Sequence, residues 1–396
     1  MIFDRQHFRF FGNREVNALN VSLALMNFGE GLISLFVPIY LWQLGTPIWK
    51  IIFFYFLISF FFAALSFTFL PLLKILSDKI MMFLSIPLVI LYFLGLGYLN
   101  EWAWLFYALP LAHAANILLF NVGYHLDFSG ASDGEFIGRE VGTQFMISSL
   151  VSFGSPFIGG VLIAIFGFRY AFFAGSAVLF LAILPLFFFP KRIMPKALSA
   201  AEVAGFLKNR GIFNFTVSGA GYAMERMVDF IVWPLFLFFT IGNIEKFGGA
   251  LSLGLLAVAV VTFLVGFLSD QGKRRRTLKY STLLLFVAWV SRIFGGGAGF
   301  MVGNHVAGKV VAGALLVAWS SQYYKIARAL PDASAFILSR EVLYHLVRVV
   351  FLPVLGALAY FSPAETFFKT SFALAAALSL LFLFANRMPH TNELNH

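Results

Sequence analysis

Residues 136–141 read Phe-Ile-Gly-Arg-Glu-Val and residues 336–342 read Phe-Ile-Leu-Ser-Arg-Glu-Val, so one short motif occurs twice in the chain. Three further pairs recur in the same order: Leu76-Ser77-Asp78 with Leu268-Ser269-Asp270, Pro156-x-x-Gly159 with Pro353-x-x-Gly356, and Glu30 and Pro38 with Glu225 and Pro234. The copies lie about 192 to 201 residues apart, close to half of the 396-residue chain. Copies in the same chain order indicate a parallel duplication.

The composition predicts a membrane protein rather than a soluble one. The chain is 60% hydrophobic and 12% charged, whereas soluble proteins carry about 25% charged residues. Cys is absent, which excludes disulfides and thiolate metal sites. No HExxH motif, no Walker-type phosphate loop and no large extramembrane segment occur in the sequence. We therefore expect neither an enzyme, nor a bound cofactor, nor an ATP-driven pump.

Twelve stretches are apolar and long enough to cross a bilayer, which takes about 20 residues. The first six are residues 17–44, 48–70, 80–99, 103–122, 142–165 and 168–189, and the second six are residues 213–240, 247–268, 278–298, 303–321, 341–361 and 366–386. With the duplication, they predict an all-α integral membrane protein of about 12 transmembrane helices in two pseudo-twofold six-helix halves. The halves would be residues 1–190 and 213–396, joined by a connector at 191–212 with a short interfacial helix after Ser199.

The loop charges predict which way the chain crosses the membrane. If the N-terminus is inside, about twenty Lys and Arg residues fall on the inner side and four on the outer, namely Lys50, Arg169, Lys246 and Lys369. We therefore expect a multi-pass protein of the plasma (inner) membrane with both termini cytoplasmic. The net charge of +10 then reflects topology and anionic lipids rather than nucleic-acid binding. The first apolar run is too long for a cleavable signal.

A basic motif follows the eighth span and has a weaker copy after the second. It comprises Gly266, Asp270, Gly272, Lys273, Arg274 and Arg275, and the weaker copy keeps only Leu76-Ser77-Asp78-Lys79. With the predicted topology, this resembles the major facilitator superfamily, whose signature is Gly-x-x-x-Asp-x-x-Gly-Arg-Arg, although one residue is missing here before the second Gly. The resemblance implies that Asp78 and Asp270 lie at helix ends and brace a neighbouring helix. Arg139 and Arg340 are their candidate partners, and an ordinary solvated loop acid is the alternative.

The fifth span contains Gly154-Ser155-Pro156-Phe157-Ile158-Gly159-Gly160, which resembles the Gly-Pro-x-x-Gly-Gly motif of drug–proton antiporters in the same family, apart from the inserted Ser155. Proline kinks a helix and small residues let a neighbour approach closely, so we expect a packing hinge here. The residues expected to serve conformational switching are Asp78, Arg139, Pro156, Gly159, Gly266, Asp270, Gly272, Arg274, Arg340 and Pro353.

Ionisable residues in mid-span are costly and are therefore candidates for function. Glu30 lies halfway along the first span, and its counterpart in the seventh span is the group Glu225, Arg226 and Asp229. The resemblance places these two helices beside the central cavity. We expect Glu30 to bind a proton or substrate, with a structural acid paired to an Arg as the alternative. The full candidate set is Glu30, Asn27, His113, Asn116, Glu225, Arg226, Asp229, Lys309, His345 and Arg348.

Several residues carry narrower expectations. Arg348 could supply an ionic partner to the seventh-span group, and Tyr222 and Trp233 either stack on a ligand or pack in the core. Arg292 lies near the outer end of its span and is expected to snorkel to the surface. His305 shares a helix face with Lys309 and is a lesser candidate. Trp42, Trp49, Trp102 and Trp104 fit an interfacial belt, and Asp127, Asp133 and Glu135 are expected to be solvated.

Together these features predict a secondary active transporter that moves a small solute by alternating access, coupled to protons through a carboxylate that meets an Arg in one state only. Its partners would be a small-molecule substrate, protons and the lipid bilayer. Arg226 is compatible with a substrate carboxylate or phosphate, or with simple neutralisation of its acidic neighbours. The alternatives are a multidrug or lipid-like exporter and a non-transporting membrane sensor or partner subunit.

Overall fold

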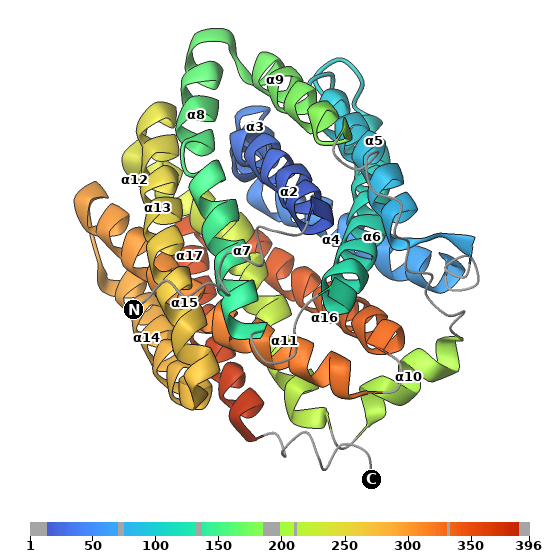
Figure 1. Ribbon diagram of the computed structural model, residues 1–396. Helices are drawn as coiled ribbons and strands as arrows, with labels where there is room; N and C mark the ends of the chain where they lie inside the picture. The colour runs from blue at the N-terminus through green and yellow to red at the C-terminus, as the bar shows by residue number, and fades with distance from the viewer. Residues whose placement is uncertain are drawn as a thin grey trace.

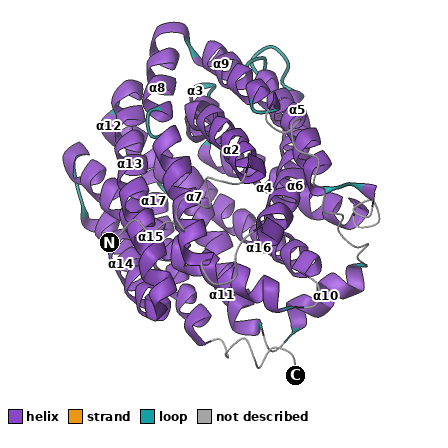
Figure 2. Ribbon diagram, viewed as in Figure 1, coloured by secondary structure: helices purple, strands orange, loops and turns teal. Residues whose placement is uncertain are grey.

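The computed structural model describes residues 14–69, 75–131, 137–184, 199–209, 212–330 and 333–387, and over these ranges the chain is helical with short connections and no strand (Figures 1 and 2). Residues 14–184 form α2 (Arg14–Ile33), η1 (Ser34–Phe36), α3 (Val37–Gln43), α4 (Ile48–Phe69), α5 (Asp78–Leu96), α6 (Leu105–Ala131), α7 (Ile137–Ser152), α8 (Ser155–Phe166) and α9 (Phe168–Leu181). We call this part the N-terminal half.

The part from 212 to 387 is called the C-terminal half here, and α10 (Ala200–Lys208) precedes it. It contains α11 (Phe213–Met227), η4 (Val228–Val232), α12 (Trp233–Ile241), α13 (Ile244–Leu268), η5 (Ser269–Lys273), α14 (Arg274–Phe294), α15 (Ala298–Ala329), α16 (Ala333–Phe361), α17 (Ala364–Ser379) and η6 (Leu380–Arg387). Within the described ranges, ten helical segments are long and apolar enough to cross a membrane, so the chain is a multi-pass integral membrane protein.

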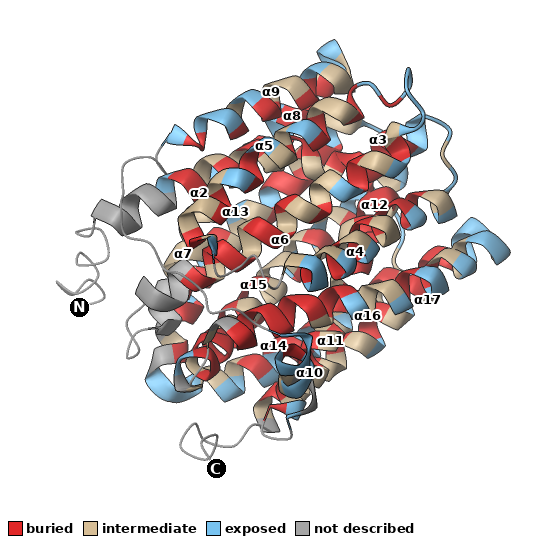
Figure 3. Cartoon of the chain, turned by 90° about the vertical axis from the view of Figure 1, so that its right-hand side faces the viewer, coloured by how far each residue is buried: buried red, intermediate tan, exposed pale blue. Residues whose placement is uncertain are grey.

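Each predicted span has a helical counterpart, but several helices are longer than their apolar stretch. The fourth span was expected at 103–122 and α6 ends at Ala131, while the tenth was expected at 303–321 and α15 covers Ala298–Ala329. Backbone hydrogen bonding continues into polar sequence at the helix ends, which hydropathy does not register. Exposed and intermediate positions alternate with buried ones along the helices (Figure 3). Many exposed positions carry large apolar side chains such as Val260, Phe294 and Val350, which suits contact with lipid.

The first and seventh spans are interrupted at corresponding places. A 3₁₀ turn, η1, stands before Pro38 in the first, and a π-helical turn, η4, stands before Pro234 in the seventh. A proline ring collides with the carbonyl four residues earlier in a regular α-helix, and a change of helical pitch relieves that collision. The duplicated prolines therefore have a local structural consequence in both copies.

Pro156 divides the fifth span into α7 and α8, as the motif predicted. Pro156 occupies the start of α8, and the freed amide N–H of Phe157 donates to Ser252 Oγ of α13 at 3.1 Å. A Cβ at Gly159 would lie 2.0 Å from the Leu32 carbonyl oxygen, so α2 contacts α8 through backbone. The expected packing hinge is present. Its copy is not equivalent, because Pro353 lies inside the uninterrupted helix α16.

The two halves meet along two long helix pairs. Helices α7 and α8 run beside α13 (Figure 1), where a Cβ at Gly142 would lie 2.7 Å from the Thr262 carbonyl oxygen and one at Gly248 would lie 2.3 Å from that of Pro156. Helix α4 packs against α16, with the Phe62 and His345 rings stacked at 3.6 Å. These are the second span against the eleventh and the fifth against the eighth, pairs that a pseudo-twofold axis interchanges.

The basic motif after α13 is explained in part by backbone geometry. Gly272 has φ +78°, a conformation that only glycine adopts without strain, and the chain turns there from α13 into α14. Gly266 allows the close approach of Gly142 from α7. Asp78 begins α5 after the N-cap residue Ser77 and is buried. The side chains of Asp270 and Arg139 lie outside the described set, so the predicted brace stays a prediction.

The connector forms the expected short helix. Ser199 caps α10 in a capping box with Glu202, and hydrogen bonds from the Ser199 backbone N–H and hydroxyl lower the pKa of the Glu202 carboxyl. Val203 is buried, and Phe206 contacts Phe336 of α16. Helix α10 is thus attached to the C-terminal half. The predicted boundary at residue 190 and the loop acids Asp133 and Glu135 fall outside the described residues, as does the side chain of Asp127.

Candidate functional site

The seventh-span acids and bases gather with residues of α14 and α15 into one charged cluster, which we define as Glu225, Arg226, Asp229, Arg292 and Lys309. Asp229 is its centre, because a single oxygen, Oδ2, accepts hydrogen bonds from Arg226 Nη1 and Lys309 Nζ, each at 2.8 Å. The Asp229 side chain is 12% exposed and that of Lys309 22%. At this degree of burial, water screens the ion pairs only partly. Removing one charged partner would therefore leave the other poorly solvated and destabilise the protein.

The π-helical turn η4 helps to bring these groups together. Arg226 lies at the end of α11 and Asp229 is the second residue of η4. A π-helical turn adds a residue to the helix and rotates the side chains that follow relative to those before it. Glu225 and Asp229 were predicted to share one face of the helix, and in the structure both line the same pocket.

Arg292 does not snorkel, so that prediction was wrong. Its side chain is buried at 3% exposure, with the guanidinium carbon 3.7 Å from the Trp233 ring centre and 4.0 Å from that of Trp289. Its Nε donates to Asn304 Oδ1 at 2.6 Å. Two aromatic faces and an amide hold the cation inside the helix bundle. Trp289 lies three residues earlier on the same helix, whereas Trp233 comes from α12 and Asn304 from α15.

Glu225 is held by one of these two tryptophans, Trp289. Its Oε1 accepts a hydrogen bond from Trp289 Nε1 at 2.9 Å, and Trp233 Nε1 donates to His305 Nδ1 at 2.9 Å. Trp233 is therefore a core residue, which was one of its two expected roles. Glu225 finds its partner outside its own helix, as the facing directions of adjacent residues predicted.

A small pocket lies beside the charged cluster, with a volume of about 20 Å³ that has room for about one water molecule. It is lined by the five cluster residues, by the apolar side chains of Leu285, Ala312, Leu315, Leu316 and Phe382, and by Tyr222, Trp289 and Gly308. All of these residues belong to the C-terminal half. The structure thus joins charges and apolar surface in one concave site.

Glu30 lies apart from this cluster, in α2. It is half-buried, and within the described part of the chain it makes no hydrogen bond and no ion pair. Its neighbour Gly29 packs on the Gly175 backbone of α9. A carboxylic acid in the middle of a predicted span without a cationic partner is unusual.

The remaining candidates of the N-terminal half contact other helices of the same half. The His113 ring stacks on Tyr92 at 4.2 Å, and its buried Nδ1 has no hydrogen-bond partner. Asn116 donates to the Ser85 carbonyl oxygen at 3.0 Å, and Asn27 donates to Ser148 Oγ at 3.0 Å. Asn116 and Asn27 therefore tie helices together, whereas His113 keeps an unused polar atom beside Tyr92.

Arg348 does not pair with the seventh-span acids. Its Nε donates to the Ala223 carbonyl oxygen at 3.3 Å, and Nη1 lies 3.4 Å from His345 Nε2. His345 is buried and its Nδ1 has no hydrogen-bond partner. These two residues lie where α16 meets α11 and α4, near the boundary between the halves.

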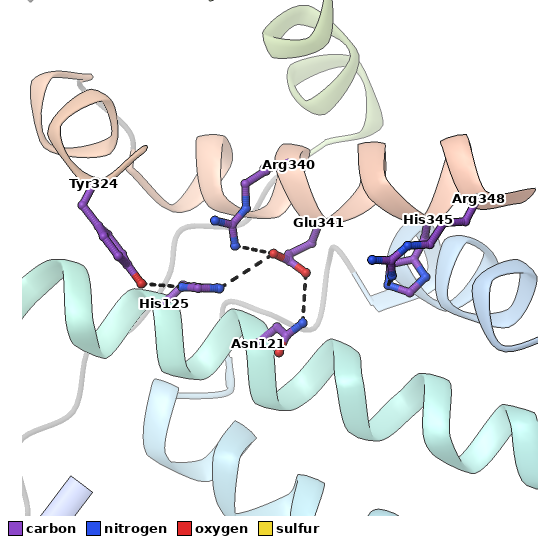
Figure 4. A network of polar contacts seen from close by, with 7 residues as sticks. All are labelled: Asn121, His125, Tyr324, Arg340, Glu341, His345 and Arg348. Atoms are coloured by element: carbon purple, nitrogen blue, oxygen red, sulfur yellow. Dashed lines mark hydrogen bonds and ion pairs between the residues drawn. The ribbon is translucent and has the colours of Figure 1, made fainter. Parts of the chain in front are cut away.

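A polar network connects the halves along α6, α15 and α16 (Figure 4). Glu341 accepts a hydrogen bond from Asn121 Nδ2 at 3.0 Å, lies 3.9 Å from His125 Nε2 and pairs with Arg340. His125 Nδ1 lies 2.8 Å from the Tyr324 hydroxyl. Sequence reasoning missed Asn121, His125 and Tyr324. It named Arg340 only as a candidate partner of the loop acids, and the structure pairs Arg340 with Glu341.

The opposite end of the bundle is closed by aromatic contacts instead. Trp42 lies 4.8 Å from Phe239, and Trp49 lies 5.9 Å from Tyr360, each pair joining one half to the other. We call this the tryptophan end, and the end with Glu341 and Arg340 the arginine end. All four predicted belt tryptophans are exposed, as an interfacial position requires. No group of three or more His, Cys, Asp or Glu residues suited to a metal occurs in the described parts.

No protein-family model matches the sequence, and no curated protein is similar to it in sequence. Solved structures do match. They include the human organic anion transporter MFSD10 (13% identity, TM-score 0.66, 93% of this chain and 99% of that one) and a bacterial homologue of the iron transporter ferroportin (16%, 0.68, 97% and 99%). The E. coli fucose:proton symporter FucP also matches (13%, 0.64, 92% and 98%). These matches along nearly the whole chain, with the paired six-span arrangement, show that the chain has the fold of the major facilitator superfamily.

Proposed function

We propose that the protein is a secondary active transporter that carries a small solute by alternating access, with protons as the coupling ion. The single observation that carries the coupling is Glu30, a half-buried mid-span carboxyl group without a hydrogen bond or ion pair among the described residues. A group of this kind can take up a proton from one side and release it to the other when water reaches it.

The contacts between the halves support the alternating motion. At the arginine end the halves are joined by hydrogen bonds such as Asn121 to Glu341, and at the tryptophan end by ring contacts such as Trp42 to Phe239. Both sets are small and can break separately, while the glycine-lined pair α8 and α13 allows sliding of closely packed backbones. Rocking about the middle of the interface would open one end at a time.

The matched structures support transport in general rather than one substrate. The matched proteins are an organic anion transporter, a homologue of an iron transporter and a fucose:proton symporter. The match to a proton symporter supports proton coupling in this chain. The match to an organic anion transporter agrees with the cationic side chains that line the pocket of the C-terminal half. The absence of a large extramembrane segment from the sequence supports a transporter rather than an enzyme.

Reconstitution of the purified chain tests the proposal. Solutes that raise its melting temperature would be offered to proteoliposomes with an imposed pH gradient, and accumulation would be followed by filtration. We expect the gradient to drive accumulation in the wild type, and Glu30→Gln to abolish the driven component because Gln binds no proton. Exchange of solute without a gradient should persist in Glu30→Gln.

Two results would contradict the proposal. Gradient-driven accumulation unchanged in Glu30→Gln would exclude Glu30 as the coupling site. Saturable binding without any flux across a sealed bilayer would instead favour a membrane sensor or partner subunit of the same fold. A melting-temperature measurement on Glu30→Gln shows that the variant is folded.

A further inference from the structure

We infer that the connector helix α10 is a positioning element for the arginine end, with Phe206 as its main contact. The Phe206 ring begins a series of aromatic contacts that ends at Arg340, the cation paired with Glu341. The inference rests on the proposed function only for regarding the opening of this end as a step of transport. It is carried by the packing of α10, by the ring contacts of Arg340 and by the bonds from this region to the other half.

The first step is where α10 packs. Helix α10 lies on α16 and, to a smaller extent, on α11 (Figure 1). Val203 is 1% exposed, and the Phe206 ring lies 6.5 Å from the Phe336 ring of α16. Phe336 precedes Arg340 by four residues, so both lie on the same face of α16. Phe206 and Arg340 also line one pocket of about 20 Å³, which has room for about one water molecule. The connector therefore packs on the helix face that presents Arg340.

The second step is how Arg340 is held. Its guanidinium carbon lies 3.7 Å from the centre of the Tyr323 ring and 5.4 Å from that of Tyr344. Phe336 stacks on Tyr323 at 5.4 Å, and Tyr323 is fully buried. Arg340 Nε is buried and has no hydrogen-bond partner in the described structure, so ring faces contribute much of what fixes this cation. A shift of Phe336 would therefore change the ring surface that the cation contacts.

The third step connects this region to the N-terminal half. Arg340 pairs with Glu341, and Glu341 accepts a hydrogen bond from Asn121 Nδ2 of α6 at 3.0 Å. Tyr324 of α15 contacts the same helix, with its hydroxyl 2.8 Å from His125 Nδ1. These contacts break when the halves separate at this end. Docking of α10 therefore favours the conformation closed at the arginine end, because it holds the rings and the cation where the contacts with α6 form.

Pulsed electron resonance on the full chain in lipid nanodiscs tests the inference without solute or gradient. Spin labels at Ile75→Cys and Lys279→Cys report the arginine end, and labels at Trp102→Cys and Phe361→Cys report the tryptophan end. Phe206→Ala should raise the ratio of long to short distances at the arginine end by roughly two- to tenfold, because a ring contact that favours the closed conformation is lost. Distances at the tryptophan end should not lengthen.

Further variants separate positioning from a general structural role. Phe213→Ala, the matched control, removes the same ring from an exposed position at the start of α11 and should leave both distance distributions unchanged. Phe206→Leu should restore most of the closed population, because leucine keeps much of the apolar contact. In a Glu341→Gln background, Phe206→Ala should add less than it does alone, because the contact that it positions is already weakened. If Phe206→Ala does not fold, Val203→Ala should give the same shift at the same end.

Four results would overturn the inference. They are unchanged arginine-end distances in Phe206→Ala and Val203→Ala, equal effects of Phe206→Ala and Phe213→Ala, equal lengthening at both ends, and full additivity of Phe206→Ala with Glu341→Gln. Opening of the arginine end in Phe206→Ala without any solute flux contradicts only the proposed function. Gradient-driven flux with unchanged distances in Phe206→Ala contradicts only the positioning role of α10.

Discussion

At the scale of single residues, the charged cluster is built around one oxygen atom. Asp229 Oδ2 accepts from Arg226 and Lys309 at equal distances, and neither cation has another acidic hydrogen-bond partner in the described structure. Removing one member of a buried charge group leaves the others unpaired in a poorly solvated place, which destabilises more than the pair itself stabilised. Replacing Asp229 should therefore lower the free energy of unfolding more than the loss of a single hydrogen bond would.

Asp229→Asn is expected to lower the free energy of unfolding by about 3 kcal/mol, because both cations lose their counter-charge. Thermal unfolding of the detergent-solubilised protein measures it. The control is Glu365→Gln, which breaks an exposed pair with Lys369 and should leave the melting temperature unchanged. The double variant Asp229→Asn with Lys309→Met should lose less than the sum of the two single variants. Equal melting temperatures for Asp229→Asn and the wild type would show that the cluster is solvated.

At the scale of helices, the contacts between the halves depend on glycine. A Cβ at Gly248 would lie 2.3 Å from the Pro156 carbonyl oxygen, but one at the adjacent Gly249 would lie 3.8 Å from the Phe157 ring, an ordinary contact. Backbone atoms cannot move aside as a flexible side chain can, so α8 and α13 would have to separate. The close contact of the helices therefore requires glycine at position 248 but not at position 249.

Gly248→Ala is expected to destabilise the protein by about 1–3 kcal/mol, as overpacking does. Gly249→Ala should be neutral or slightly stabilising, since alanine favours the helix. Melting temperatures of the two variants, measured side by side, check this. Solute flux should also slow in Gly248→Ala alone, because sliding along this contact is part of the proposed motion. Equal effects of the two substitutions would contradict the close packing.

At the scale of the whole molecule, the two ends of the interface are held by different chemistry. The arginine end has a hydrogen-bonded network around Glu341, and the tryptophan end has apolar rings (Figure 4). Weakening one set shifts the balance between conformations open at one end and at the other. The chain has no cysteine, so introduced cysteines report the distance between the halves directly.

Glu341→Gln is expected to widen the arginine end, because the substitution removes the ion pair with Arg340 and weakens the contact with His125. Spin labels at Ile75→Cys and Lys279→Cys, both exposed, should show a larger population of long distances in pulsed electron resonance. A second pair at Trp102→Cys and Phe361→Cys at the tryptophan end should not lengthen. Identical distance distributions with and without Glu341→Gln would show that the network does not hold the halves.

The membrane spans were easier to predict from the sequence than the contacts within the candidate site. Spans follow from local hydropathy, and the interruptions at Pro38, Pro156 and Pro234 follow from the proline ring, so both could be read along the chain. The site could be read only in part. Glu225, Arg226, Asp229 and Lys309 were found because charges are rare in spans, but Arg292 was misjudged because its depth was considered without its neighbours. The spacing of Trp289 and Arg292 on one helix face was the available signal.

What the sequence by itself determined is the positions of the spans and the set of charges inside them, because each depends on residues close together in the chain, and the duplication, which needs only a comparison of short motifs. Only the tertiary structure decided which charges meet. It placed Arg292 between Trp233 and Trp289, gave Asp229 two cations, left Glu30 without one, and joined His125 to Glu341. Trp289 and Arg292 share α14, and Arg226 lies three residues before Asp229, but the other partners lie on different helices. Pairing between helices depends on how the helices rotate and pack, which no local pattern specifies.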